Sequence, residues 1–140
     1  MKRENKIYSD EIKDMLLSKG ISPSFQRIKI YEYLMKHRIH PSAETVYLDL
    51  VGEIPTLSRT TVYSTLKLFA DNGMARRLFI EGSLVRFDID TSNHMHFKCT
   101  KCGAVYDIFS ASPKIKNAEH RVESEEIYLY GVCKKCKEEE

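Results

Sequence analysis

The sequence predicts an α+β fold made of two parts. Over residues 9–73, apolar side chains recur every three or four positions, which is the spacing of amphipathic helices. From residue 78 onward, short apolar runs alternate with polar turns, which is typical of strands. The chain has 140 residues, enough for two small domains. We therefore predict one domain over residues 1–88 and a second over residues 89–140.

Four helices are predicted in the first domain, and each begins after a serine. A serine side chain accepts a hydrogen bond from a free backbone N–H group of the first helical turn, whereas glycine and proline end helices. The expected N-caps are Ser9, Ser22 (followed by Pro23), Ser42 and Ser58, and the expected ends are Gly20, Pro41, Pro55 and Gly73.

A β-hairpin is predicted after the fourth helix. Apolar residues 78–80 and 84–87 flank the turn residues 81–83. Three helices followed by a hairpin are the elements of a winged helix-turn-helix, and here one more helix precedes them. In that arrangement the last helix before the hairpin, about residues 58–71, is the recognition helix that enters a DNA groove.

The second domain is predicted to combine short strands with one short helix. Strands are expected near residues 95–99, 104–109 and 126–132, and a helix from residue 113 to about residue 121. The tail from Lys134 is rich in Lys and Glu, so we expect it to fray beyond Cys136.

Charge is distributed unevenly between the two parts. Residues 1–86 hold 14 Lys or Arg and 10 Asp or Glu, a net charge of +4, whereas residues 87–140 hold 8 and 10, a net charge of −2. A basic first domain favours a polyanionic partner, and nucleic acid is the usual one. No apolar run is long enough for a membrane span, and none follows the basic N-terminus, so a cytoplasmic protein is expected.

The four cysteines form two C-x-x-C pairs in the second domain, Cys99 with Cys102 and Cys133 with Cys136. A two-residue gap lets one turn direct two sulfurs at one ion, and Gly103 relieves the backbone crowding of such a turn. The pairs predict a tetrahedral, structural zinc site without an open catalytic position. Two disulfides or four unrelated thiols are the alternatives, and a reducing compartment disfavours the disulfides.

A second candidate site consists of histidine and aspartate. On a strand, His94 and His96 would project from the same face, so both imidazoles could reach one ion. Asp88 precedes them, Asp107 follows on a predicted strand, and His40 lies far upstream. Such a set suits Fe(II), Mn(II), Zn(II) or Co(II). Spacing alone leaves open the alternative of a polar strand face, two solvated carboxylates and a helix-end histidine.

The order of several motifs resembles the ferric uptake regulator family, and most closely its peroxide-sensing branch. The resemblance runs from about residue 16 to residue 136. The matching segments are residues 20–27 (GISPSFQR), 40–47 (HPSAETVY), 58–63 (SRTTVY), 86–88 (RFD), 94–96 (HMH), 99–103 (CTKCG) and 130–136 (YGVCKKC).

The resemblance implies a metal-dependent transcriptional repressor and not an enzyme. It implies a homodimer whose subunits have an N-terminal winged helix and a C-terminal α/β dimerisation domain. The four cysteines match structural zinc ligands, which implies one Zn2+ per subunit. The residues that match the family's ligands for a regulatory Fe2+ or Mn2+ are His40, Asp88, His94, His96 and Asp107.

The two aspartates point to the peroxide-sensing branch. Iron-uptake regulators typically have Glu at both acidic positions, whereas that branch resembles this chain in having Asp88 and Asp107. In that branch, iron-catalysed oxidation of a ligand histidine destroys the regulatory site, and His40 and His94 are the matching histidines. Sensing of iron, manganese or zinc availability, without peroxide chemistry, is the alternative.

The partner implied by the resemblance is a palindromic, A/T-rich double-stranded DNA operator. The start of the recognition helix offers hydroxyls, N–H groups and an Arg to phosphate. The family's Tyr that matches Tyr63 touches bases, and core packing is the alternative for this residue. The candidate DNA-contacting residues are Ser58, Arg59, Thr60, Thr61, Tyr63, Ser64 and Lys67.

Two departures from the family pattern lie in the second domain. Some members have another His/acid site, which needs ligands near residues 93 and 124–125. This chain has Asn93, Ser124 and Glu125 there, so that site is not predicted. The segment between the cysteine pairs also looks shorter than usual, which implies a reduced dimerisation helix.

Two other function classes compete with a regulator. A metalloenzyme is disfavoured because five protein ligands leave little room for an activated water, and no separate general base is evident. A zinc-ribbon module for protein interactions is the other class. It would lack the metal-dependent, salt-sensitive retention of duplex DNA that a regulator has.

Overall fold

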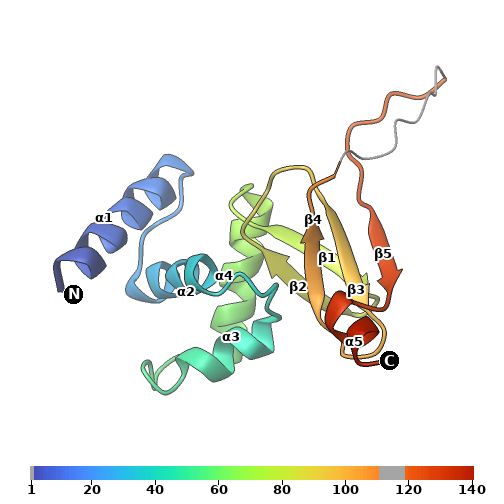
Figure 1. Cartoon of the computed structure of the whole chain (residues 1–140). Helices are drawn as coiled ribbons and strands as arrows, with labels where there is room; N and C mark the ends of the chain where they lie inside the picture. Colours follow the sequence, from blue (N-terminus) through green and yellow to red (C-terminus); the bar gives the residue numbers. More distant parts are fainter. Residues whose placement is uncertain (1, 111–118) are drawn as a thin grey trace. The chain divides into compact units, whose positions relative to one another are not determined.

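The structure is a computed structural model that describes residues 2–110 and 119–140 (Figure 1). It divides into two compact units, Met1–Thr91 and Ser92–Glu140. The predicted domain boundary, between residues 88 and 89, lies close to this division. The helix predicted from residue 113 to about residue 121 falls mostly outside the described residues. Within the described ranges, no helix is both long and apolar enough to cross a membrane.

The first unit contains four helices followed by a hairpin, as predicted. The helices are α1 (Lys2–Ser18), α2 (Phe25–Lys36), α3 (Ala43–Leu50) and α4 (Arg59–Asp71). The strands β1 (Arg76–Glu81) and β2 (Leu84–Asp88) pair in antiparallel fashion. This order of elements confirms the predicted winged helix, with α4 in the place of the recognition helix.

Serine caps fix where α3 and α4 begin, as the sequence predicts. The Ser42 side chain accepts a hydrogen bond from the Thr45 N–H group, and the Ser58 side chain accepts one from the Thr61 N–H group. Gly73 follows α4 with a φ of 71°, a left-handed conformation that glycine adopts without strain.

Two of the predicted helix starts are wrong. α1 begins at Lys2 and not after Ser9, because the preceding residues include neither glycine nor proline to stop the helix. α2 is capped by Ser24 and not by Ser22. The Arg27 guanidinium donates to the Ser22 carbonyl oxygen at 2.9 Å, which holds Ser22 in the non-helical segment before α2.

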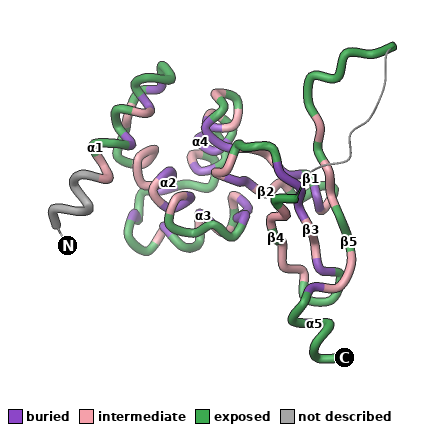
Figure 2. The backbone as a smooth tube through the Cα atoms, turned by 45° about the horizontal axis from the view of Figure 1, so that its top comes forward, coloured by how far each residue is buried: buried purple, intermediate pink, exposed green. Residues whose placement is uncertain are grey.

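The core of the first unit is formed by the buried faces of its helices. Val62, Leu66 and Phe69 of α4 are fully buried, whereas other residues of the same helix remain exposed (Figure 2). Tyr31 of α2 meets Phe69 edge to face, with ring centroids 5.3 Å apart. The core therefore decides which face of α4 is left for a partner.

The hairpin is longer and its loop tighter than predicted. β1 and β2 extend beyond the two apolar runs, and only Gly82 and Ser83 separate the strands. Gly82 has a φ of 70°, the conformation that short hairpin loops require. Phe87 of β2 pairs with Arg77 of β1 and joins the helical core, so the hairpin packs onto the helices.

The second unit is built on a three-stranded sheet with the order β4-β3-β5. The strands are β3 (Met95–Cys99), β4 (Val105–Ile108) and β5 (Tyr128–Gly131). β3 has the predicted bounds, and β4 and β5 lie within their predicted ranges. β3 pairs with β4 in antiparallel fashion and with β5 in parallel fashion. The short helix α5 (Lys134–Glu138) follows β5 (Figure 1).

The prediction that the tail frays beyond Cys136 is wrong, because α5 continues to Glu138. Cys133 is the N-cap of this helix, and its sulfur accepts a hydrogen bond from the Cys136 N–H group. Lys135 and Lys137 lie in the last turn, where positive charge is favourable near the helix C-terminus.

Truncation of the core side of α4 tests how far the recognition helix depends on packing. Leu66→Ala is expected to lower the free energy of unfolding of the first unit by about 2–5 kcal/mol, because Leu66 is fully buried. Leu48→Ala is the matched control, since Leu48 is 58% exposed, and its effect is expected to stay within about 0.5 kcal/mol. Urea unfolding followed by circular dichroism measures both, and equal effects would contradict the assigned core.

Candidate metal centres and nucleic-acid interface

The sheet of the second unit brings the two cysteine pairs together. The parallel register aligns Cys99, the last residue of β3, with Gly131, the last residue of β5. The turn with Cys102 follows β3, and Cys133 and Cys136 follow β5. The Thr100 N–H group donates to the Gly131 carbonyl oxygen at 2.7 Å, which ties the two strand ends to each other.

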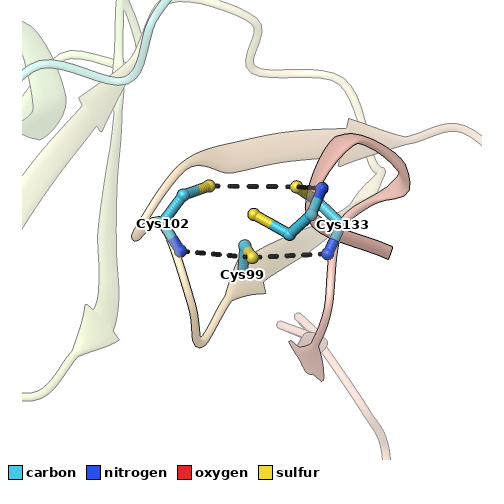
Figure 3. Close-up of side chains that lie close together, drawn as sticks. Cys99, Cys102 and Cys133 are labelled. Atoms are coloured by element: carbon cyan, nitrogen blue, oxygen red, sulfur yellow. Dashed lines mark hydrogen bonds between the residues drawn. The ribbon is translucent and has the colours of Figure 1, made fainter. Parts of the chain in front are cut away.

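The four cysteine sulfurs lie close enough to share one ion. All four are within 4.8 Å of one another, and the Sγ atoms of Cys102 and Cys133 are 3.8 Å apart (Figure 3). Zinc–sulfur bonds of about 2.3 Å in a tetrahedron put neighbouring sulfurs about 3.8 Å apart. The cluster therefore has the dimensions of a zinc site with four cysteine ligands.

The protonation of the cysteines also fits a cation at the centre of the cluster. The N–H groups of Cys102 and Cys133 donate to the Cys99 sulfur at 3.5 and 3.3 Å, and they lower the pKa of that thiol to about 6. A hydrogen bond to Cys133, together with burial, raises the pKa of Cys136 to about 12. The thiols of Cys99 and Cys136 thus have pKa values shifted in opposite directions. A divalent cation would stabilise the thiolate form of all four cysteines.

Tyr106 of β4 is a neighbour of the cysteine cluster that the sequence analysis missed. The Cys136 N–H group and the Tyr106 hydroxyl both hydrogen-bond the Cys133 sulfur and lower the pKa of its thiol. Groups that hydrogen-bond a metal ligand orient it and tune its basicity. The available signal was the position of Tyr106, on the strand that leaves the first cysteine turn.

In the first unit, His40 and Asp88 form a buried pair. His40 Nε2 lies 3.5 Å from Asp88 Oδ2, and both side chains are less than a tenth exposed. The other carboxylate oxygen, Oδ1, accepts a hydrogen bond of 2.9 Å from the Asp90 N–H group. One oxygen of Asp88 is thus anchored to the backbone, while the second faces the imidazole.

Backbone contacts hold His40 against the strand that carries Asp88. His40 has a φ of 55°, a left-handed conformation that is uncommon outside glycine. Arg86 of β2 donates to the His40 carbonyl oxygen at 3.1 Å, and the Phe87 N–H group donates to the Pro41 carbonyl oxygen at 2.9 Å. These bonds fix the position of the imidazole through the main chain.

In the second unit, two histidines converge on Asp107. The antiparallel register sets His96 of β3 directly opposite Asp107 of β4. The Nε2 atoms of His94 and His96 lie 3.0 and 3.4 Å from the same oxygen, Asp107 Oδ1. Both imidazoles are buried, so these histidines do not lie on a solvated face of the strand.

The surroundings of His94 aim one particular ring nitrogen at Asp107. His94 Nδ1 lies 2.8 Å from the Ser92 carbonyl oxygen, to which it can only donate. A neutral imidazole with the proton on Nδ1 has its lone pair on Nε2, the atom that faces Asp107. Metal-binding histidines commonly have this arrangement, in which a backbone carbonyl fixes the tautomer.

The five predicted regulatory ligands are thus divided between the two units. His40 and Asp88 are brought together in the first, and His94, His96 and Asp107 in the second. Asn93 Nδ2 donates to Glu125 Oε1 at 3.2 Å. These are two of the positions where some family members have ligands of a further metal site, which is not predicted for this chain.

Most of the predicted DNA-contacting residues are exposed on α4 or next to it, whereas Thr61 is half-buried. Thr60, Tyr63, Ser64 and Lys67 are exposed, and Tyr63 is 55% exposed, so core packing is excluded for it. Ser58 instead caps the helix, and its hydroxyl also donates to Thr61 Oγ1 at 2.8 Å.

Several residues beside the exposed face of α4 were not selected from the sequence. Tyr63 and Lys67 border a depression of about 210 Å3 that Arg77 and Phe79 of β1 also line. Glu44 of α3 forms an ion pair with Arg59 at 2.9 Å. The period of two along a strand, which places Arg77 and Phe79 on the same face of β1, was the signal for these residues. The sequence offered no signal for Glu44, since its partner Arg59 lies 15 residues away along the chain.

The winged helix, the cysteine cluster and the buried His–Asp groups define a metal-binding transcription regulator that acts on DNA. Residues 18–133 match the sequence profile of the Ferric uptake regulator family. The chain belongs to this family, which confirms the resemblance noted in the sequence. The predicted cofactors, a structural zinc ion and a divalent regulatory ion, agree with the two kinds of donor group.

Individual relatives are similar along most of the chain. It is 35% identical over 133 residues to the peroxide-responsive repressor PerR of Staphylococcus epidermidis (strain ATCC 12228 / FDA PCI 1200), covering 86% of this chain and 84% of that protein. It is 32% identical over 136 residues to the peroxide operon regulator of Bacillus subtilis (strain 168), covering 93% and 94%. The fold is similar to that of the Vibrio cholerae ferric uptake regulator, with a TM-score of 0.69, 26% identity and coverage of 86% and 98%.

Loss of one sulfur tests the cysteine cluster. Cys99→Ser is expected to release zinc from the purified protein, because Cys99 is fully buried at the end of β3 and no other thiol can replace it. Tyr106→Phe is the control, since it removes only a hydrogen bond to Cys133, and it is expected to retain zinc. Metal analysis after mild chelation measures both, and full zinc retention by Cys99→Ser would overturn the assignment.

Proposed function

We propose that the chain is a metal-dependent, DNA-binding transcriptional repressor, with Zn2+ in the cysteine cluster and Fe2+ or Mn2+ bound by the histidines and aspartates. One observation carries this proposal: in each unit, a buried imidazole faces a carboxylate. His40 lies 3.5 Å from Asp88 in the first, and His94 lies 3.0 Å from Asp107 in the second. The Asp88 carboxylate is buried and the Asp107 carboxylate is half-buried, and a divalent cation would supply positive charge to both.

The resemblance to the family implies that one ion takes donors from both units, which are joined by a linker over residues 89–93. Asp88 ends β2 and His94 immediately precedes β3. The six peptide units between them span at most about 20 Å, which sets an upper limit on the separation of Asp88 and His94. An ion bound by donors of both units would hold the linker in one conformation. Metal binding would in this way restrict the angle between the DNA-binding unit and the second unit.

In a two-fold dimer, that angle determines whether both α4 helices reach DNA. Successive major-groove faces recur about every 34 Å, so the recognition helices of the two subunits must be set at this separation. A metal ion favours the DNA-binding form only as far as it binds that form more tightly than the others. Five donors that meet in one form and separate in another provide such a difference.

The presence of aspartate at both acidic positions favours peroxide as the signal that the regulatory site senses. Asp88 and Asp107 are shorter by one methylene group than glutamate, which leaves space beside an ion for a small molecule. Fe2+ held by these residues would promote cleavage of the O–O bond of hydrogen peroxide. In the net reaction, one oxygen atom would be added to a histidine ring carbon and the other would leave as water. The resemblance to the peroxide-sensing branch indicates His40 and His94 as the ligands that would be oxidised, and loss of either ligand would release DNA. The relatives from S. epidermidis and B. subtilis are named as peroxide regulators, which supports this choice.

Sensing of metal availability is the second candidate function. The same His–Asp donors suit Fe2+, Mn2+ and Zn2+, and the V. cholerae protein of similar fold is a ferric uptake regulator. In this alternative, the free metal concentration alone would load or empty the site. The protein would then return to its original state without covalent change, and this separates the two candidates.

Removal of one imidazole tests the regulatory site. His94→Ala is expected to abolish Mn2+-dependent binding to duplex DNA while leaving the zinc content and the helical circular dichroism unchanged. His120→Ala is the matched control, because His120 is an exposed histidine of the same unit. Fluorescence anisotropy with a library-selected duplex, with and without Mn2+, measures binding. Unchanged metal dependence in His94→Ala would remove the regulatory site from the proposal.

Intact-mass analysis of the Fe2+-loaded protein after low-dose peroxide tests the stimulus. A gain of one oxygen atom that maps to His40 or His94 is expected, with a parallel loss of DNA binding. Asp107→Glu is expected to retain the metal and to gain oxygen more slowly, because the longer side chain fills the space beside the ion. Oxidation confined to cysteine or Met95 would instead favour sensing of metal availability.

A further inference from the structure

Arg59, the first residue of α4, is held by two residues of α3. Its Nε atom donates to Glu44 Oε2 at 2.9 Å, and its Nη2 atom donates to Glu44 Oε1 at 3.0 Å. Its guanidinium carbon lies 4.3 Å from the centre of the Tyr47 ring. A forked ion pair and a stacked ring together restrict a side chain that would otherwise sample many rotamers.

These two contacts leave one edge of the guanidinium open. Arginine has five N–H bonds, and the pair with Glu44 uses the Nε side of the group. Tyr47 covers one face of the plane. No bond from Nη1 to a described residue is among the hydrogen bonds of Arg59. The outer edge, formed by Nη1 and Nη2, therefore presents two donors, and the Arg59 side chain is 62% exposed.

We propose that Arg59 contacts a guanine base in the DNA major groove, and that Glu44 and Tyr47 are its positioning residues. This inference rests on the proposed DNA-binding function. Two donors on one edge match the O6 and N7 acceptors of guanine, the commonest specific contact of arginine with DNA. Arg59 also lies at the N-terminal end of the recognition helix, the part that meets base edges in helix-turn-helix proteins.

The charge of Glu44 distinguishes a base contact from a phosphate contact. The Glu44 carboxylate lies beside the guanidinium and is 52% exposed, so it would repel an approaching phosphate. The guanine edge is neutral and is not repelled in this way. The ion pair thus cancels the general attraction of Arg59 for the DNA backbone and preserves its directional hydrogen bonds. Glu44 would consequently increase sequence discrimination while it decreases non-specific binding.

The test selects duplexes from a random 30-base-pair library with the full-length, Mn2+-loaded protein. Wild type is expected to enrich guanine at one position in each half-site. Replacement of that base by 7-deazaguanine, which lacks the N7 acceptor, is expected to weaken wild-type binding about tenfold. Arg59→Ala is expected to lose the guanine preference and to be insensitive to 7-deazaguanine. Glu44→Gln is expected to weaken the preference and to bind unrelated duplexes more tightly.

The control for loss of an ion pair is Glu32→Gln, which breaks the pair between Glu32 and Lys36 on α2. It is expected to keep the wild-type guanine preference. An Arg59→Ala protein that keeps the preference, and whose binding depends less steeply on salt, would identify a phosphate contact and overturn the proposal. A Glu44→Gln protein identical to wild type would overturn the positioning role. Failure of wild type to select any duplex would instead contradict the proposed function.

Discussion

The parallel pairing of β3 with β5 is the constraint on which the second unit depends. It aligns Cys99 with Gly131, so that the two cysteine-containing segments, which are distant in sequence, begin beside each other. Among the described residues, the apolar cluster around the cysteines adds only Phe97 and Val132, which is a small core for a unit of about 50 residues. A metal ion bound by the cysteines would keep the strand ends together, and the strands in turn position the sulfurs. Sheet and ion therefore depend on each other.

The same strand connects the cysteine cluster to the histidines. β3 ends at Cys99, and His94 and His96 lie at its opposite end. An extended strand keeps its two ends at a fixed separation, so support at Cys99 also limits the movement of the imidazoles. The structural ion would thus contribute to regulation without any contact with the regulatory one. A sheet that loosened at the cysteines would also lose the alignment of His96 with Asp107.

The sequence predicted most of the fold because local chemistry decides it. Ser42 and Ser58 cap the amphipathic segments that follow them, and the strands lie at the short apolar runs. The start of α2 was misplaced because both Ser22 and Ser24 precede the helix, and it is the Ser24 side chain that accepts a hydrogen bond from the Arg27 N–H group. Convergence of His94 and His96 on Asp107 depends on strand register, which spacing alone does not give. The pairing of Glu44 with Arg59 depends on how α3 and α4 pack against each other, so no local sequence pattern predicts it.

The backbone of His40 has a consequence for how the protein would be used in a cell. Hydrogen bonds to the carbonyl groups of His40 and Pro41 hold this left-handed segment through the main chain. Chemical damage to the ring would therefore leave the loop and the helical core folded. Oxygen added to a ring carbon is not removed by thiol reductants, so each molecule would respond once. Repression would then return only as fast as new protein is synthesised, and the cell would retain a memory of exposure set by its growth rate.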